Sequence, residues 1–337
     1  MSAADDSLGP LTTFLSEGEK VALAIVIASF GSSPRPVGSM MAITQSGRIA
    51  GSVSGGCVES AVIHAAQEKI FSGGAPQILH YGVTNERAFE VGLACGGEIT
   101  VLLTPLRGNS MALIAEWQKA RDDRKEVALG TRMRDGEVQI LPSLGAVRDA
   151  IGSGMPIHRI ELAGEAWIIN VIPPPLRMLV VGAVHITQNL VPMATVLGLA
   201  VTVIDPRRAL ATVDRFPGAA ISHDWPDQAL RSLALGPRDA VLALSHDSKF
   251  DDPALDAALC SPAFYIGALG SQKSQGARRA RLMALGHDET TLARLRGPVG
   301  LPIGAIGAAE IALSILAGII AAHRQSPLAT LPWPVKK

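Results

Sequence analysis

The chain has 337 residues, of which 48% are hydrophobic and 18% charged, and its 30 Lys and Arg residues balance 30 Asp and Glu residues. This composition excludes a disordered or acidic-tail protein, and the neutral balance argues against a general polyanion binder. Aromatic residues make up 4% of the chain, too few for a platform on which nucleic-acid bases stack. We therefore expect no nucleic-acid partner, and at about 150 residues per domain the length predicts two domains.

In the first half, strands are predicted to alternate with glycine-rich turns. The predicted strands cover residues 21–29, 39–43, 49–54 and 99–103. Helices are expected over residues 58–70, where apolar residues recur at near-helical spacing, and around residues 111–121. The remainder of the stretch from 107 to 164 predicts several short strands.

The prolines at positions 173–175 mark the predicted domain boundary, because consecutive prolines fit neither a helix interior nor a central strand. Beyond them, strands and helices alternate, which predicts a parallel sheet with helices on both faces. The expected strands are residues 178–181, 201–204, 219–222, 240–244 and 264–266, and the expected helices are residues 186–197, 253–259, 274–285 and a buried core helix at 311–322. The predicted domains are residues 1–172 and 176–325.

The three cysteines, Cys57, Cys95 and Cys260, form an odd number without a CxxC pair, which is typical of free thiols in a reducing compartment. The apolar run at residues 21–30 follows acidic residues and lacks the basic start of a signal peptide. The late apolar run is shorter than the roughly 20 residues that a membrane helix needs. We expect a cytoplasmic protein without membrane contact.

Two loops of the first half, residues 31–38 and 51–59, combine glycines, hydroxyls, one arginine and the thiol of Cys57 beside a predicted helix start. Unpaired backbone amides and a helix N-terminus favour anions, and a cysteine placed there is expected to be reactive. The loop Cys95-Gly96-Gly97 repeats the pairing of a thiol with glycines. The alternative is that the glycines only shape turns and the thiols are small buried hydrophobic groups.

The first turn of the second half fits a dinucleotide-binding turn only in part. Gly182 stands at the first glycine position, but Val184 stands where a side chain would crowd a pyrophosphate. Asp205 follows at the end of the next predicted strand, ~20 residues on, where an acidic residue takes a ribose hydroxyl. The fold is thus predicted more strongly than this ligand.

Polar groups also follow other strands of the second half. Ser222-His223-Asp224 and Ser245-His246-Asp247 each come after a predicted strand, so His185, His223 and His246 are candidates for a metal or general-base site, with turn capping as the alternative. On the predicted helix at 274–285, Arg278, Arg279 and Arg281 are expected to form a solvated face.

Several separate motifs carry a resemblance to a known family. They are Gly31-Ser32-Ser33-Pro34-Arg35-Pro36, Ser54-Gly55-Gly56-Cys57-Val58-Glu59, Cys95-Gly96-Gly97, Ser245-His246-Asp247, Gly267-Ala268-Leu269-Gly270-Ser271, Gly300-Leu301-Pro302-Ile303-Gly304-Ala305 and Ala309-Glu310-Ile311-Ala312. In this order they resemble the xanthine dehydrogenase accessory family, XdhC/CoxI. The resemblance implies an α/β chain with an N-terminal α+β domain of XdhC/CoxI type and a C-terminal Rossmann-like doubly wound parallel sheet.

The resemblance also implies a cytoplasmic maturation factor and not an enzyme with turnover of its own. Such a chaperone binds molybdenum cofactor (molybdopterin, with the dinucleotide form left open), protects it while a cysteine desulfurase supplies sulfur, and inserts it into the large subunit of a molybdenum hydroxylase of xanthine or aldehyde dehydrogenase type. The expected cofactor-binding residues are Ser32, Ser33, Arg35, Ser54, Gly55, Gly56, Cys57, Cys95, Gly182, His185, Asp205 and His246. Arginine and backbone amides suit the anionic phosphate, and the thiolate of Cys57 is the expected metal ligand.

The chain also departs from the family pattern. Val184 replaces a glycine of the second domain's turn, and Gly307-Ala308-Ala309 replaces more polar residues near the C-terminus. Two alternatives remain open: an NAD(P)-dependent oxidoreductase that uses the Rossmann-like domain and Asp205, and a scaffold that only docks the desulfurase onto its target. The apolar run at residues 311–320 leaves homodimer formation open as well.

Overall fold

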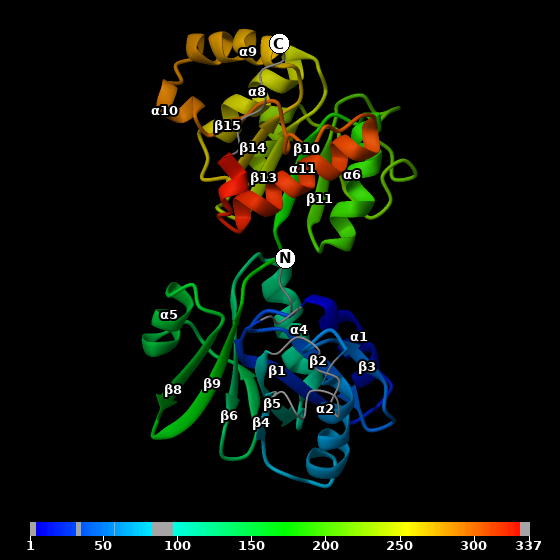
Figure 1. The fold of residues 1–337 in the computed structure, drawn as a ribbon, viewed down its shortest axis with the longest axis vertical. Helices are drawn as coiled ribbons and strands as arrows, with labels where there is room; N and C mark the ends of the chain where they lie inside the picture. The colour runs from blue at the N-terminus through cyan, green and yellow to red at the C-terminus, as the bar shows by residue number, and fades with distance from the viewer. Residues whose placement is uncertain (1–4, 32–34, 57, 83–96, 331–337) are drawn as a thin grey trace. The chain divides into compact units, whose positions relative to one another are not determined.

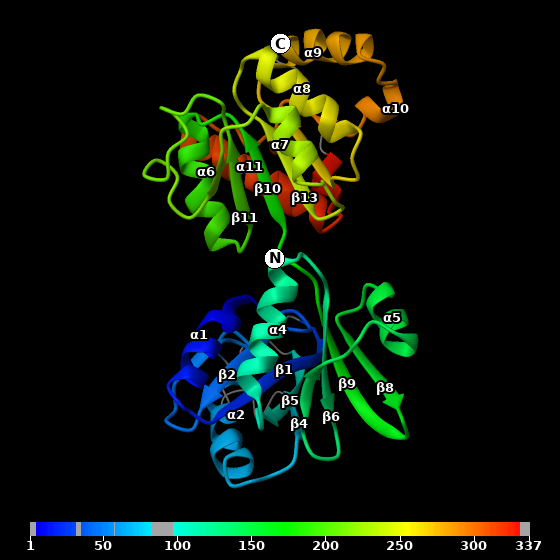
Figure 2. The same cartoon turned by 180° about the vertical axis from the view of Figure 1, so that it is seen from behind.

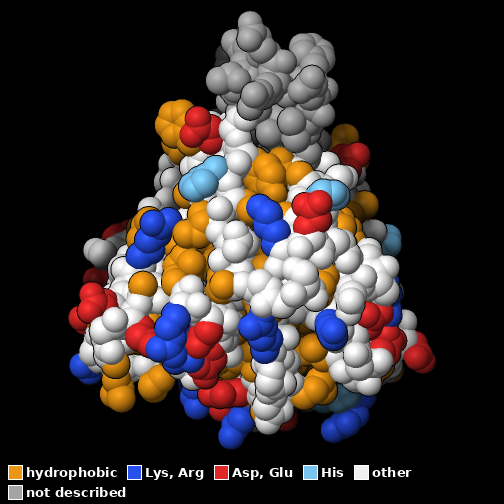
Figure 3. All heavy atoms as spheres, turned by 90° about the horizontal axis from the view of Figure 1, so that it is seen from below, with side chains coloured by type: hydrophobic (Ala, Val, Ile, Leu, Met, Phe, Trp, Pro, Cys, Tyr) orange, Lys and Arg blue, Asp and Glu red, His pale blue; other side chains and the backbone are white. Residues whose placement is uncertain are grey.

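The computed structural model describes residues 5–31, 35–56, 58–82 and 97–330. The chain divides into two compact units, Ser2–Pro174 and Pro175–Lys337, and the boundary along the chain falls within the three consecutive prolines. Within the described residues, no helix reaches the length and hydropathy that crossing a bilayer requires. On the face drawn in Figure 3, basic and acidic side chains are interspersed, as the neutral composition leads one to expect.

The first unit contains a five-stranded antiparallel sheet with the strand order β3-β2-β1-β5-β4. Its strands are β1 (Val21–Phe30), β2 (Met40–Thr44), β3 (Ile49–Gly51), β4 (Gln77–Tyr81) and β5 (Glu98–Pro105). Helices α1 (Asp5–Ser16) and α4 (Ser110–Asp122) cover one face, and α2 (Glu59–Ala65), which continues as a π-helical turn (Ala66–Ile70), covers the other (Figures 1 and 2).

The first seven residues of strand β1, 21–27, are buried on both faces, which explains their unbroken apolar sequence. Leu23 and Ile25 pack in the same cluster as Trp117 of α4. Ala24, which points to the opposite face, packs in the cluster that contains Val62 of α2. The sheet thereby positions α2, whose first residue, Glu59, contacts the segment that follows β3.

A second, four-stranded antiparallel sheet completes this unit, with the order β7-β6-β9-β8. It consists of β6 (Val127–Arg132), β7 (Val138–Ile140), β8 (Ile157–Leu162) and β9 (Glu165–Ile172), with α5 (Gly145–Gly152) beside it. Val147 of α5 packs with Trp167 and Ile169 of β9 in a core of its own.

The second unit is a six-stranded parallel sheet with the order β12-β11-β10-β13-β14-β15. Its strands are β10 (Arg177–Val181), β11 (Ala200–Ile204), β12 (Ala220–Ser222), β13 (Asp239–Ala243), β14 (Tyr265–Ala268) and β15 (Leu295–Arg296). From β10 the chain first adds strands on one side of the sheet, toward β12, and then on the other side, from β13 to β15. This reversal of direction between β10 and β13 is the doubly wound arrangement of dinucleotide-binding domains. The predicted Rossmann-like sheet is confirmed.

Helices cover both faces of this sheet (Figures 1 and 2). On one face lie α6 (His185–Val196) and α11 (Ala308–His323). On the other face lie α7 (Pro226–Ser232), α8 (Ser248–Leu259) and α9 (Gln272–Ala284). The short helix α10 (Glu289–Leu292) follows α9, and a 3-10 turn (Pro327–Thr330) follows α11. The predicted buried core helix near the C-terminus is confirmed as α11, whose Ile315 and Ile319 pack with Leu190 of α6.

The sequence patterns did not anticipate α1, α5, α7, α10 or β4, and they placed several boundaries wrongly. Gly9 and Pro10 disfavour a helix in the sequence pattern of α1. The helix forms because its apolar side, made of Leu8, Leu11 and Phe14, packs on the sheet. The strand expected over residues 49–54 ends at Gly51, since the following residues fold around a side chain of α2. Helix α8 begins five residues earlier than expected, where the Asp247 side chain accepts a hydrogen bond from the Lys249 amide.

Candidate functional site

The loop that precedes α2 folds around the carboxylate of Glu59. The two carboxylate oxygens accept hydrogen bonds from two hydroxyls and from four successive backbone amides. The donors are the hydroxyls of Ser52 (2.6 Å) and Ser54 and the amides of Val53 (3.2 Å), Ser54 (2.9 Å), Gly55 (3.1 Å) and Gly56 (2.9 Å). Such a run of amides forms a concave anion site, and here the anion is part of the chain itself.

These contacts determine the charge state of Glu59. Burial by itself would raise the pKa of this carboxyl, but the hydroxyls of Ser52 and Ser54 and the amide of Ser54 stabilise the ionised form more strongly and lower the pKa to about 2 from 4.5. Ser54 is only 3% exposed, and its hydroxyl also accepts the Val58 amide at 2.9 Å. The charged carboxylate therefore shapes the loop, and Ser54 is committed to that task.

This geometry corrects the expectation that Gly55 and Gly56 present unpaired amides to a ligand, because both amides donate to Glu59. The expectation of a ligand contact from Ser54 does not fit its burial either. Sequence reasoning missed the role of Glu59. The available signal was its position three residues after Gly56, the offset at which a glutamate of the first helical turn reaches back to preceding amides.

Arg35 lies against the same loop. Its Nε donates to the Ser52 carbonyl at 3.1 Å, so the arginine of the first predicted loop lies next to residues of the second. Ser32, Ser33, Cys57 and Cys95 lie outside the described residues, and their assignment to the cofactor stays a prediction. Cys57 is separated from the Glu59 carboxylate by one residue of sequence.

In the second unit, the turn after β10 is closed by protein groups. Gly182 has φ +113°, and a Cβ there would lie 2.8 Å from the Ser245 backbone nitrogen. The next amide, that of Ala183, donates to Asp205 at 2.8 Å. Asp205 is 1% exposed and bound to Arg207 through both carboxylate oxygens, at 2.8 and 2.6 Å.

These contacts argue against the expected ligand roles of Gly182 and Asp205. The Gly182 amide donates to the Ile204 carbonyl at 3.0 Å, and its Cα packs against the Ser245 backbone. Burial would raise the pKa of Asp205, but the hydrogen bonds from Arg207 and from the Ala183 amide, together with the charge of Arg207, outweigh burial and lower the pKa below its usual value. A buried carboxylate already bound to a guanidinium and two amides is poorly placed to take a ribose hydroxyl.

A cavity of about 470 Å³ lies in the second unit, after the carboxyl ends of β13 and β14. This is the edge at which open α/β sheets bind ligands. Apolar side chains form most of its wall, and the polar groups are few. The lining includes Ile186, His246, Leu269, Gly270, Ser271, Lys273, Val299, Ala305, Ile311 and Ser314. The cavity is large enough for a substantial part of a small organic ligand.

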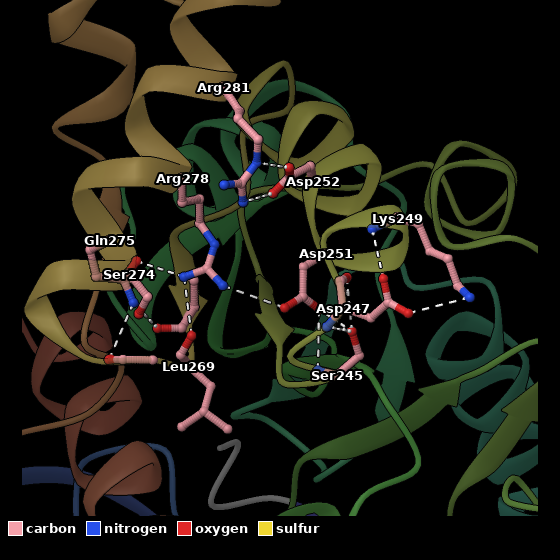
Figure 4. Close-up of polar contacts among 12 residues, drawn as sticks. Ser245, Asp247, Lys249, Asp251, Asp252, Leu269, Ser274, Gln275, Arg278 and Arg281 are labelled. Atoms are coloured by element: carbon pink, nitrogen blue, oxygen red, sulfur yellow. Dashed lines mark hydrogen bonds and ion pairs between the residues drawn. The ribbon is translucent and has the colours of Figure 1, made fainter.

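A buried polar network holds two loops of this cavity in place (Figure 4). Arg278 extends from α9 and donates to the Leu269 carbonyl at 3.1 Å and to Gln275 Oε1 at 2.7 Å. Its Nη2 lies 3.5 Å from the Asp251 carboxylate, which accepts a hydrogen bond from the Ser245 hydroxyl at 2.6 Å. The network therefore joins the loop after β14 to the loop after β13.

The prediction that Arg278 belongs to a solvated face is wrong, because the residue is only 6% exposed. Burial lowers the pKa of Arg278, and burial raises the pKa of Asp251, with Ser245 and Arg278 only partly opposing that rise. The neighbouring Arg279 and Arg281 are more exposed and pair with Glu289 and Asp252 respectively. Three arginines of one helix thus have different surroundings, which their spacing alone does not reveal.

Comparison with known proteins gives consistent results for the two units. Residues 14–82 match the model of the XdhC and CoxI family, and residues 178–319 match that of the XdhC Rossmann domain. The chain is 30% identical over 305 residues to the molybdenum cofactor insertion chaperone PaoD of Escherichia coli (strain K12), which covers 90% of this chain and 84% of PaoD. The chain belongs to the XdhC/CoxI family.

Another relative and a solved structure agree with this assignment. A probable xanthine dehydrogenase component of Bacillus subtilis (strain 168) is 27% identical over 334 residues, covering 94% of this chain and 97% of that protein. A crystal structure of a xanthine dehydrogenase from Bacillus halodurans superposes with a TM-score of 0.76 and 26% identity, over 98% of both chains.

Four of the motifs that resemble XdhC/CoxI proteins meet at the cavity. They contribute His246, the segment Leu269-Gly270-Ser271, Ala305 and Ile311 to its wall. His246 has a left-handed backbone (φ +63°), and the turn around it is held by the Asp247 amide, which donates to the Ser245 hydroxyl at 3.1 Å. Motifs far apart in the sequence thus surround one space.

The three histidines proposed as metal or general-base candidates in this XdhC/CoxI chain have different surroundings. His246 lines the cavity, whereas exposed His185 begins α6 and His223 Nε2 contacts the Ala211 carbonyl at 2.8 Å. Within the described ranges, the group of side chains at metal-ligand spacing contains none of them. The idea that they gather around one metal is therefore wrong, and His185 stays a prediction as a cofactor contact.

Proposed function

We propose that this chain is a molybdenum cofactor insertion chaperone that serves an enzyme of the xanthine dehydrogenase type. The observation that carries the proposal is the 30% identity to the chaperone PaoD across both units. The relatives named as xanthine dehydrogenase proteins support the class of client.

The donor groups of the chain fit this cargo in part. Molybdenum cofactor is an anionic pterin dithiolene, for which a guanidinium and a thiolate are suitable partners. Arg35, placed beside the Ser52 loop, would bind the phosphate, and Cys57 would approach the molybdenum end. The amides of Gly55 and Gly56 are not counted among the donors, because Glu59 already occupies them.

Glu59 has an indirect role in this proposal. Its buried carboxylate holds the backbone of residues 53–56, which precede Cys57, in one conformation. A chaperone must release its cargo, and no acid/base pair for turnover is required. The proposal further includes protection of the cofactor during sulfuration by a cysteine desulfurase, followed by transfer to the large subunit of the molybdenum hydroxylase.

The cavity of the second unit is by itself a candidate site for an organic ligand. Its apolar wall suits a ring system, and Lys273 and Ser271 at its margin suit an anionic group. The rival oxidoreductase function loses its main support, because Asp205 is buried and paired with Arg207 and Val184 stands at the pyrophosphate position.

The test is a titration of the purified full-length chain with molybdenum cofactor, with retained pterin quantified by fluorescence after gel filtration. We expect stoichiometric retention by the wild type and a loss of at least tenfold in affinity for Cys57→Ala and Arg35→Ala. Arg48→Ala and Cys260→Ser serve as controls for the loss of an arginine or a thiol elsewhere and should retain cofactor. Equal retention by all variants, or saturable NAD(P)H binding without cofactor binding, would overturn the proposal.

A further inference from the structure

Asp256, Cys260 and His287 form a cluster at the far end of helix α8 from the cavity. Asp256 and Cys260 are four residues apart and so project from the same side of the helix end, where Cys260 is the C-terminal capping residue. His287 comes from the segment that follows α9, and its Nε2 lies 2.8 Å from Asp256 Oδ1. The carboxylate oxygen, the thiol sulfur and the imidazole nitrogen all lie within 4.8 Å of one another.

The backbone around these three groups is held in place on both sides. Arg294 donates to the carbonyls of Leu259, Ser261 and Ala263, at 2.8, 2.8 and 2.9 Å, and so fastens the turn that carries Cys260. The His287 amide donates to Leu282 at the end of α9, and the imidazole side chain is only 9% exposed. Helix α9 lies beside both α8 and α10 in the two ribbon views (Figures 1 and 2).

The cluster is separate from the ligand cavity. The cavity lies where β13 and β14 end, whereas Cys260 precedes β14 and lies where that strand begins. None of its three members belongs to the motifs discussed for the cofactor. Whatever the cluster binds is therefore distinct from the proposed molybdenum cargo, which we assign to Arg35 and Cys57.

We propose that Asp256, Cys260 and His287 form a zinc site with three protein ligands and an open fourth position. The set of one thiolate, one imidazole and one carboxylate suits Zn²⁺, whereas Mg²⁺ and Ca²⁺ prefer oxygen ligands alone. Two of the donors come from one helix face and the third from another segment, and a metal ion would join α8 to the segment after α9. Because Cys260 is exposed, water or an external thiol reaches the fourth position.

The present contacts require little change for a metal ion. In the structure, Asp256 and His287 share a hydrogen bond, and the metal would replace the shared proton between the same two atoms. Tetrahedral ligands at about 2.0–2.3 Å from zinc are separated by distances below the 4.8 Å limit of this cluster. Binding would release protons and stabilise the folded chain by mass action.

The test uses Co²⁺ as a spectroscopic probe of the full-length, metal-free chain, followed by displacement with Zn²⁺. Thiolate coordination should produce a sulfur-to-cobalt charge-transfer band and intense visible absorption, at one cobalt per chain. We expect both features to vanish in Cys260→Ser. Affinity should fall at least about tenfold in His287→Gln and Asp256→Asn, since even the loss of an outer hydrogen-bond partner costs about 10- to 100-fold.

Two controls separate this site from other donors. His64 pairs with Glu68 at 3.3 Å on α2 and its π-helical continuation, so His64→Gln is the matched histidine control and should leave cobalt binding unchanged. The double variant Cys57→Ser/Cys95→Ser should keep the charge-transfer band. Circular dichroism of each variant verifies folding, and exposed Cys260 can be replaced without loss of core packing.

The outcomes are decisive in either direction. A band that persists in Cys260→Ser but disappears in the Cys57 and Cys95 double variant assigns the metal elsewhere and overturns the proposal. Absence of cobalt binding above that of the His287→Gln variant overturns it as well. Neither outcome affects the cofactor titration, whose decisive variants are Cys57→Ala and Arg35→Ala.

Discussion

The Ser52 hydroxyl donates a 2.6 Å hydrogen bond to the Glu59 carboxylate, and this bond connects the end of strand β3 to the first residue of helix α2. The Ser52 carbonyl accepts Arg35, so one residue links the glutamate to the arginine. The loop between them is thereby stabilised by a charge that the chain itself provides. The contribution of this charge to the free energy of unfolding can be measured directly.

Replacement of Glu59 by Gln should destabilise the first unit, because the amide removes the charge and turns one acceptor into a donor. One pKa unit corresponds to about 1.4 kcal/mol, so the lowering from 4.5 to about 2 represents about 3 kcal/mol, which solvent near the loop reduces to about 2 kcal/mol. Urea unfolding of both proteins at pH 7 measures this loss.

The same pair of proteins should show a defined pH dependence. Since the pKa of Glu59 is lower in the folded state, its contribution is complete above pH 4.5 and is lost as the pH falls toward 2. The stability difference between wild type and Glu59→Gln should therefore shrink over that window. A difference that stays constant, or one matched by exposed Glu68→Gln, would contradict the role assigned to Glu59.

Gly182→Ala should destabilise the second unit by about 2–4 kcal/mol, because the new Cβ would lie 2.8 Å from the Ser245 nitrogen at a backbone φ of +113°. Gly276→Ala is the matched control. No atom lies within 4 Å of a Cβ at that position on α9, and helix propensity favours alanine by about 0.4–1 kcal/mol. Thermal unfolding should move in opposite directions for the two variants.

Arg278→Met should lower the free energy of unfolding by about 3–5 kcal/mol, because it leaves the Asp251 carboxylate buried without the cation that pairs with it. Adding Asp251→Asn should restore part of that stability, and the deficit of the single variant should shrink at acidic pH as Asp251 takes a proton. Arg279→Met, which breaks a more exposed pair with Glu289, should change stability by less than about 1 kcal/mol. Equal losses for the two arginines would refute the buried network.

Ala305→Phe should reduce cofactor affinity if the cavity of the second unit is a binding site in its own right, because the ring fills space at its wall. Exposed Ala309→Phe, four residues on, is the control and should bind as the wild type does. The measurement is the same pterin-retention titration. Unchanged affinity in Ala305→Phe with an unchanged melting temperature would show that the ligand does not use this cavity.

The sequence alone was sufficient for the parallel sheet, the core helix α11 and the family. Those depend on local periodicity and on the order of motifs along the chain, which need no knowledge of distant contacts. The apolar runs of β10, β11 and β13, for instance, indicate burial on both faces without reference to their neighbours.

The tertiary structure decided which polar groups are available. The sequence suggested that four residues were available to a ligand or to solvent: Gly55, Gly56, Asp205 and Arg278. The structure shows otherwise, because folding determines which groups a residue contacts, and its neighbours in the chain do not. The amides of Gly55 and Gly56 donate to Glu59, and Arg207 donates to Asp205. Arg278 is buried beside Asp251, away from solvent. An N–H group that already has a partner within the chain is not free for a ligand, and only the folded arrangement shows which groups have such a partner.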